Sequence, residues 1–73
     1  MKLQKMRIMS KDLKVGDIVL TDDKKQIYFI IDSDKTFLHN HTRLKCFYPD
    51  TQDTEIWMLE EISTYKTIWR AVI

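Results

Sequence analysis

The sequence contains one glycine, one cysteine and one proline among its 73 residues. A single cysteine, Cys46, excludes an internal disulfide and a zinc framework built from several cysteines. One glycine is too few for a loop that cradles phosphate. No apolar run approaches the roughly 20 residues that span a bilayer, and the segment 1–9 lacks the apolar stretch and cleavage site of a signal peptide. We therefore expect a cytoplasmic protein with no cofactor, no metal and no membrane contact.

Composition indicates one small folded domain. The chain is 44% hydrophobic and 11% aromatic, which is enough for a compact core and too much for a disordered tail. With a net charge of +1, the chain lacks the excess of cations that a dedicated duplex-binding protein carries. A domain of this size buries only about 60% of the surface that its unfolded chain exposes. We expect a monomer or a small homo-oligomer.

The single glycine, Gly16, precedes an alternating apolar run, residues 17–21. A glycine used once usually occupies a position that needs positive φ or a close approach of the backbone, so we place Gly16 at the start of a first hairpin strand. Residues 26–32 are rich in β-branched and aromatic side chains and apolar on both faces, which is typical of a central strand. Residues 44–48 alternate again and end at Pro49.

The segment 54–73 fits two periods. A period of four, which suggests helix, relates Trp57, Glu61, Tyr65 and Trp69, whereas residues 65–73 also alternate and are rich in β-branched side chains. Residues 54–61 therefore remain open between a strand and one short helical turn. The expected domain division is a single barrel over residues 10–73, with residues 1–9 as an N-terminal extension or a first strand.

About five short strands joined by tight polar turns predict an all-β fold, a small antiparallel barrel that contains at most one short helical turn. The run Leu13–Val19, followed by a turn and Ile27–Ile31, resembles the opening of SH3-like small β-barrels. The tyrosine-centred turn Phe47–Asp50 is similar to one in short phage-encoded proteins of that type from Gram-positive hosts. The resemblance implies an accessory or inhibitor protein of a phage, with an anti-defence role.

Charge is segregated along the chain, and the acidic part carries the leading functional hypothesis. Residues 49–61 sum to −5 and contain a tryptophan. Aromatic side chains beside acids are suited to bind a protein partner of the host or the phage. We therefore predict a binding module and not an enzyme. The residues predicted to form its partner-binding surface are Tyr48, Glu55, Trp57, Glu60 and Trp69.

The alternative hypothesis uses residues 35–48, which sum to +3 and interleave cations with aromatics. Phosphates and stacked bases need such groups, so this block would bind nucleic acid or sequester a nucleotide. Its residues are Lys35, His39, His41, Arg43 and Lys45.

Three weaker hypotheses remain: a metal site, a catalytic thiol and a homo-oligomer. His39 and His41 lack an evident third metal ligand. A thiol triad of Cys46 with one of these histidines and Asp50 lacks the strained turn that usually presents a nucleophile. The third hypothesis is a homo-oligomer in which the last strand pairs across an interface.

Overall fold

The computed structural model describes residues 2–51 and 54–72, with the backbone alone at positions 35–38. Within these residues the chain forms six strands and two short 3-10 turns: β1 (Lys2–Met9), η1 (Ser10–Asp12), β2 (Ile18–Leu20), β3 (Ile27–Leu38), β4 (His41–Tyr48), η2 (Pro49–Thr51), β5 (Thr54–Glu61) and β6 (Tyr65–Val72). The strands form one antiparallel sheet in the order β1-β6-β2-β3-β4-β5. The expected all-β antiparallel class is confirmed, with six strands in place of about five.

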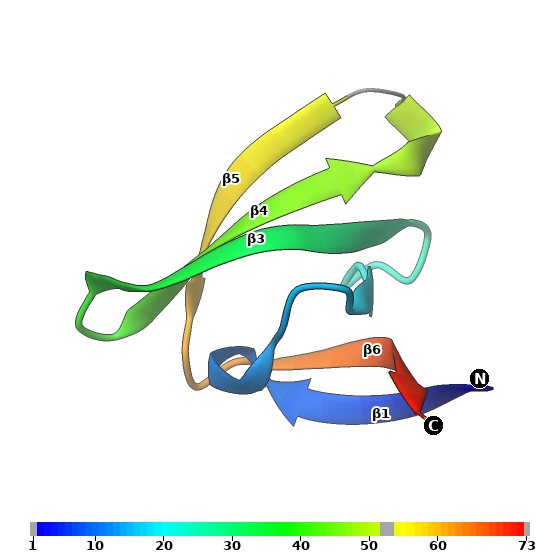
Figure 1. Ribbon diagram of the computed structural model, residues 1–73, viewed down its shortest axis with the longest axis horizontal. Coiled ribbons are helices and arrows are strands. Elements are labelled where there is room, and N and C mark those ends of the chain that lie inside the picture. Colours follow the sequence, from blue (N-terminus) through cyan, green and yellow to red (C-terminus); the bar gives the residue numbers. More distant parts are fainter. Residues whose placement is uncertain (1, 52–53, 73) are drawn as a thin grey trace.

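The sheet is curled but open, because β1 and β5 are the two ends of the strand order and do not pair with each other over the described residues. Figure 1 shows β3, β4 and β5 running together above β6 and β1. After β1 the chain turns into η1 and does not continue as a strand beside β5. In this turn the Lys11 amide donates to the Ile62 carbonyl at 3.2 Å. The expected closed barrel is therefore wrong for this part of the chain.

Gly16 occupies the tight turn that precedes β2. Its φ is 97°, and the Asp17 amide donates to the Lys14 carbonyl at 3.1 Å across the turn. A glycine with positive φ in the third position of such a turn is typical of type II geometry. The turn is joined to β3, since the Gly16 amide donates to the Ile30 carbonyl at 2.8 Å. The predicted role of Gly16 is confirmed.

The turn between β2 and β3 contains no glycine, and Lys24 adopts the left-handed conformation in its place, with φ of 61°. The Lys24 amide donates to the Thr21 carbonyl at 2.8 Å, and the Thr21 amide donates to the Gln26 carbonyl at 3.0 Å. The Asp23 carboxylate accepts hydrogen bonds from the Thr21 hydroxyl and the Lys25 amide, which lower the pKa of Asp23. These contacts hold a turn that glycine usually makes easier.

The two faces of the sheet differ sharply. The inner face of the curl holds the core, whose buried members are Leu13, Val19, Tyr28, Ile30, Leu44, Cys46 and Ile68. On the outer face, paired positions form a row across all six strands, and its members are half-buried apart from the exposed Lys5 and Glu55: Lys5, Trp69, Ile18, Phe29, Phe47 and Glu55.

Residues 54–61, which the sequence left open, form the strand β5, and β6 follows after a tight turn. The turn is fixed by the Thr64 amide and hydroxyl, which donate to the Glu61 carbonyl at 3.2 and 2.8 Å. β6 lies between β1 and β2, and it pairs with β1 along its whole length and with β2 at residues 67–69. The last strand is thus an inner strand of the sheet, and its pairing across an interface stays a prediction from the sequence. No helix in the described part of the chain is long and apolar enough to cross a membrane.

Candidate functional site

The outer face of β4 and β5 holds an exposed tryptophan with a cation beneath it. Trp57 is opposite Lys45 in the register and is 42% exposed. The Arg43 guanidinium carbon lies 4.4 Å from the centroid of the Trp57 ring, within the range of a cation–π contact. Arg43 is in turn 3.5 Å from an Asp34 carboxylate oxygen. The indole thus contacts a cation and still exposes part of its surface to a partner.

Glu55 lies on the same face, one outward position before Trp57. Its carboxylate is 3.2 Å from the Lys45 ammonium. Glu55 also ends the row of paired outer-face residues and lies next to Phe47. The Phe47 ring stacks on the Phe29 ring, with 6.3 Å between their centroids and 13° between their planes. Two predicted site residues, Glu55 and Trp57, are therefore neighbours on one exposed surface.

Trp69 lies on the same face but far along it. Three strands, β2, β3 and β4, separate β6 from β5 in the sheet. The Lys5 ammonium lies 5.5 Å from the Trp69 ring centroid, so this tryptophan has its own cation on β1. Trp69 and Trp57 therefore cannot contact one small ligand together, although both belong to the outer face.

Tyr48 and Glu60 point to the inner face instead. The Tyr48 ring centroid is 5.1 Å from that of Tyr28, and the Tyr48 hydroxyl donates to the Met58 sulfur at 3.3 Å. Burial raises the pKa of Tyr48. Glu60 is 3.6 Å from the Lys66 ammonium. The structure thus divides the five predicted partner-binding residues among three places.

The residues of the basic block are also dispersed. The side chain of Lys35 lies outside the described residues. His39 is in the turn between β3 and β4 and is exposed, whereas His41 is in β4 opposite Glu61. Arg43 and Lys45 are bound to carboxylates, as described above. Because these cations lie against acids, the block offers less free positive charge than its sequence suggests.

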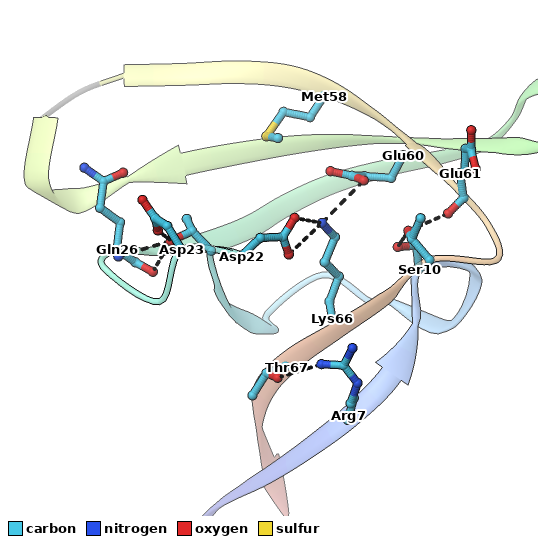
Figure 2. Close-up of polar contacts among 12 residues, drawn as sticks. Arg7, Ser10, Asp22, Asp23, Gln26, Met58, Glu60, Glu61, Lys66 and Thr67 are labelled. Atoms are coloured by element: carbon cyan, nitrogen blue, oxygen red, sulfur yellow. Dashed lines mark hydrogen bonds and ion pairs between the residues drawn. The ribbon is translucent and has the colours of Figure 1, made fainter.

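Figure 2 shows a polar cluster where β5 and β6 approach each other on the inner face. Lys66 is only 9% exposed, and its ammonium donates to both Asp22 carboxylate oxygens at 3.4 Å. These distances and the 3.6 Å to Glu60 are long for charge-assisted hydrogen bonds. The cluster keeps a buried lysine near two acids but does not hold it tightly.

A second charged group, at the other end of the inner face, is held tightly. Asp17 is 2% exposed, and Arg70 donates to its two oxygens through Nε at 2.8 Å and a terminal nitrogen at 2.7 Å. The Lys14 amide donates to the same carboxylate at 2.8 Å. The hydrogen bonds from Arg70 to Asp17 raise the pKa of Arg70. A pocket of about 170 Å³ lies beside this clamp, lined by Lys14, Val15, Gly16, Asp17, Arg70 and Ala71.

The thiol that the sequence allowed in a triad is enclosed by the core. Cys46 is fully buried, and its sulfur is 3.7 Å from the Leu44 carbonyl oxygen. Burial raises the pKa of the Cys46 thiol to about 12. A thiol without access to solvent and with such a pKa is a poor nucleophile. Among the described residues, no three histidine, cysteine, aspartate or glutamate side chains gather in a way that could hold a metal ion.

Sequence reasoning missed the apolar exposure of β5. Ile56 and Leu59 are 41% and 46% exposed, on opposite faces of the strand. The signal was present in the run Ile56–Leu59, four apolar residues in succession that must expose some members if the strand lies at an edge. The role of Arg43 was also missed, because the sequence assigned it to the rival basic site.

No protein-family model, curated protein or solved structure matches this chain. The functional argument therefore depends on the chemistry of the surfaces described above.

Proposed function

We propose that this chain is a non-enzymatic protein-binding module that takes up an extended segment of a partner along β5, with Trp57 as the anchor. The observation that carries the proposal is that β5 ends the strand order while exposing three large apolar side chains, Ile56, Trp57 and Leu59. Long apolar edge strands are templates for pairing with another chain, and proteins use this mode of recognition widely.

The peptide groups of β5 support strand addition. The Ile62 amide donates to the Asn40 carbonyl at 3.1 Å, at the position where the β4–β5 register continues. Hydrogen-bonded pairs alternate along an antiparallel ladder, so even positions of β5 direct their peptide groups to β4. The odd positions 55, 57 and 59 consequently direct theirs to the open edge, and their side chains lie on the outer face.

The charge of β5 favours a basic segment. The strand contains Glu55, Glu60 and Glu61 and no lysine or arginine. Glu55 and Glu60 each lie near one cation of another strand, Lys45 and Lys66, but the charged side chains of the edge strand itself are all acidic. An added strand lies about 4.8 Å away, so its side chains would lie beside these acids. A partner segment with one cation opposite Glu55 and another opposite Glu60, and with side chains between them that can pack on Trp57 and Leu59, fits this edge.

A matched pair of aromatic substitutions tests the proposal. Trp57→Ala removes the anchor, whereas Tyr65→Ala removes an aromatic of similar exposure, 48%, from β6 on the same face. A photo-crosslinking residue at position 59 of the immobilised chain should capture one discrete protein from an extract of the cells in which the chain occurs, and capture should fall at least about tenfold with Trp57→Ala. The Tyr65→Ala protein should capture the partner normally.

Either of two results contradicts the proposal. One is undiminished crosslinking by the Trp57→Ala protein. The other is equal crosslinking from position 59 and from a probe at position 25, in the turn between β2 and β3. A phage origin and an SH3-like relationship stay predictions from the sequence, and the proposal needs neither of them.

A further inference from the structure

The opposite edge of the sheet is a chemical complement of β5. β1 is also eight residues long and ends the strand order, and it carries Lys2, Lys5 and Arg7 but no acid. We propose that β5 of one copy binds β1 of a second copy as an added antiparallel strand. The inference rests on the proposed function, because it names the ligand of the same open edge.

The peptide groups of the two edges are in phase. The Ser10 amide donates to the Thr64 carbonyl at 2.7 Å, where the β1–β6 register continues. By the same alternation, even positions of β1 direct their peptide groups to β6, and odd positions direct theirs to the open edge. On β5, too, the odd positions direct their peptide groups to the open edge. Pairing odd with odd therefore lets both rows of free peptide groups bond.

The same pairing keeps the faces of the two sheets aligned. Odd positions of β1 have their side chains on the outer face, where Lys5 lies over Trp69 and Arg7 lies 5.8 Å from the Tyr65 ring centroid. Odd positions of β5, including Trp57, also lie on the outer face. Antiparallel addition of β1 to β5 would thus continue the outer face of one molecule into that of the next.

One register satisfies most of the side chains. It places Arg7 opposite Glu55, Lys5 opposite Trp57 and Leu3 opposite Leu59 on the outer face. These contacts are an ion pair, a cation over an indole and an apolar pair, each of which stabilises neighbouring strands. On the inner face the same register places Lys2 opposite Glu60. Moving β1 by two residues in either direction removes the contact between Arg7 and Glu55.

Pairing of like edges is much less favourable. Two β5 strands centred on Met58 would place Glu55 of each opposite Glu61 of the other, and two β1 strands would bring lysines and arginines together. Like charges directly opposite destabilise a sheet. The contact is therefore heterologous, with one copy's β5 against the other's β1, and each added molecule leaves one edge of each kind open.

The expected assembly is weak and open-ended. One strand contact buries less than the roughly 1,200 Å² of a stable specific interface, so we expect dissociation constants of about 100 µM. Sedimentation velocity of the full chain from about 5 to 500 µM should show a weight-average mass that rises continuously, without a plateau at the dimer.

Charge reversal tests which edges meet. Glu55→Lys and Arg7→Glu should each weaken association at least about tenfold, because each places like charges opposite each other. An equimolar mixture of the two variants should regain association, since the lysine introduced at position 55 of one variant then faces the glutamate introduced at position 7 of the other. The reciprocal contact in that mixture keeps the original pair. Lys25→Glu, an equal charge change in an exposed turn, is the matched control and should associate like the original chain.

Three results would overturn the inference: an unaltered chain that is monomeric at about 500 µM, a variant mixture that does not regain association, or an Arg7→Glu protein that still associates. Circular dichroism of each variant establishes that it is folded. These failures are distinct from failure of the proposed function, because a monomeric chain whose position-59 crosslinking still depends on Trp57 would retain the β5 site and lose only the second copy as its ligand.

Discussion

Two buried charged side chains, Asp17 and Lys66, lie on the inner face of the described sheet, and the protein satisfies them in opposite ways. Asp17 accepts three hydrogen bonds of 2.7 to 2.8 Å, from Arg70 and from the Lys14 amide. Lys66 has only contacts of 3.4 to 3.6 Å, to Asp22 and Glu60. The first group is held in a preorganised clamp, whereas the second rests among acids that it barely contacts.

The difference follows from what each charge connects. Asp17 follows the Gly16 turn, and Arg70 is near the end of β6, so their pairing joins segments that are 53 residues apart. Arg70 also donates to the Asp12 carbonyl at 3.1 Å, which ties η1 to the same point. Lys66 lies near the start of β6, just after the turn from β5, and its partner Asp22 has a largely exposed side chain. The pair of Asp17 and Arg70 therefore fixes how distant segments pack, whereas the contacts of Lys66 are long and one of its partners is mostly in water.

The largest expected effect comes from breaking the clamp. Asp17→Asn replaces one acceptor oxygen by an amide that faces donors already in place, and leaves the Arg70 charge without its counterion. We expect a loss of about 3 kcal/mol in the free energy of unfolding, since removing one partner of a buried pair costs about that much. Urea unfolding measures it.

Asp12→Asn is the control for the clamp, because it makes the same chemical change at an exposed side chain. The control should change stability by less than about 0.5 kcal/mol. If the two variants were equally stable, Asp17 would be no more important than an exposed acid, and the contrast between the two buried charges would disappear.

A pH effect should arise on the Lys66 side, where Cys46 is neutral and buried. Burial, with a smaller contribution from the charge of Glu60, raises the pKa of Cys46 from its ordinary 9.0 to about 12. Between these values the folded protein keeps a proton that the unfolded chain has released, so stability is complete below pH 9 and falls as the pH rises. The fall is about 1.4 kcal/mol per pH unit.

Urea midpoints at pH 8, 9 and 10 measure this dependence on pH. Cys46→Ala should remove most of the decline between pH 9 and 10. Above pH 10 the decline should steepen in both proteins, because burial raises the pKa of Tyr28 above its ordinary 10.0 as well. Equal declines with and without the thiol below pH 10 would show that Cys46 is not the group responsible.

Local chemistry in the sequence predicted the parts of the fold that depend on neighbours in the chain. The position of Gly16 identified a turn that needs positive φ, and the β-branched run at 27–31 lies within the central strand β3. The sequence of residues 44–48 predicts an alternating strand, and in β4 two alternate positions, Leu44 and Cys46, are both buried. Such features depend on φ and on the two-residue period of a strand.

The period of four near the C-terminus shows why the rest was harder. Trp57, Tyr65 and Trp69 are on the outer face, but they belong to two strands separated by a tight turn that preserves the odd phase. Because four is a multiple of the two-residue period of a strand, side chains on one face of these strands recur every four residues, much as they would in a helix. Pairing of β1 with β6, and of Asp17 with Arg70, joins the two ends of the chain and leaves no local signal. The sequence also grouped Trp57 with Tyr48 and Glu60, which face inward. It leaves residues 54–61 open between a strand and a helical turn, so the face of Glu60 relative to Trp57 is fixed only once β5 is known to be a strand.

The two turns with positive φ extend the comparison to the backbone, since Gly16 borders the clamp and Lys24 is two residues from Asp22. Gly16→Ala should cost about 1 kcal/mol, because a Cβ strains this conformation even though it would meet no atom within 4 Å. Lys24→Gly should stabilise by about 0.5 kcal/mol, since it relieves the same strain at φ of 61°. Thermal unfolding of both variants measures the pair. A Gly16→Ala protein as stable as the original would show that the turn can change its conformation.

The smallest effect is expected where the second charge is removed. Lys66→Met together with Glu60→Gln exchanges a loosely held ion pair for groups of similar size, and Asp22 can return to water. Such exchanges are often neutral, so the free energy of unfolding should change by less than about 1 kcal/mol in urea. Lys66→Met alone should be the less stable protein, because Glu60 would then lack a cation at an inner position. A loss by the double variant as large as that of Asp17→Asn would mean that contacts of 3.4 to 3.6 Å hold this fold as firmly as the clamp does.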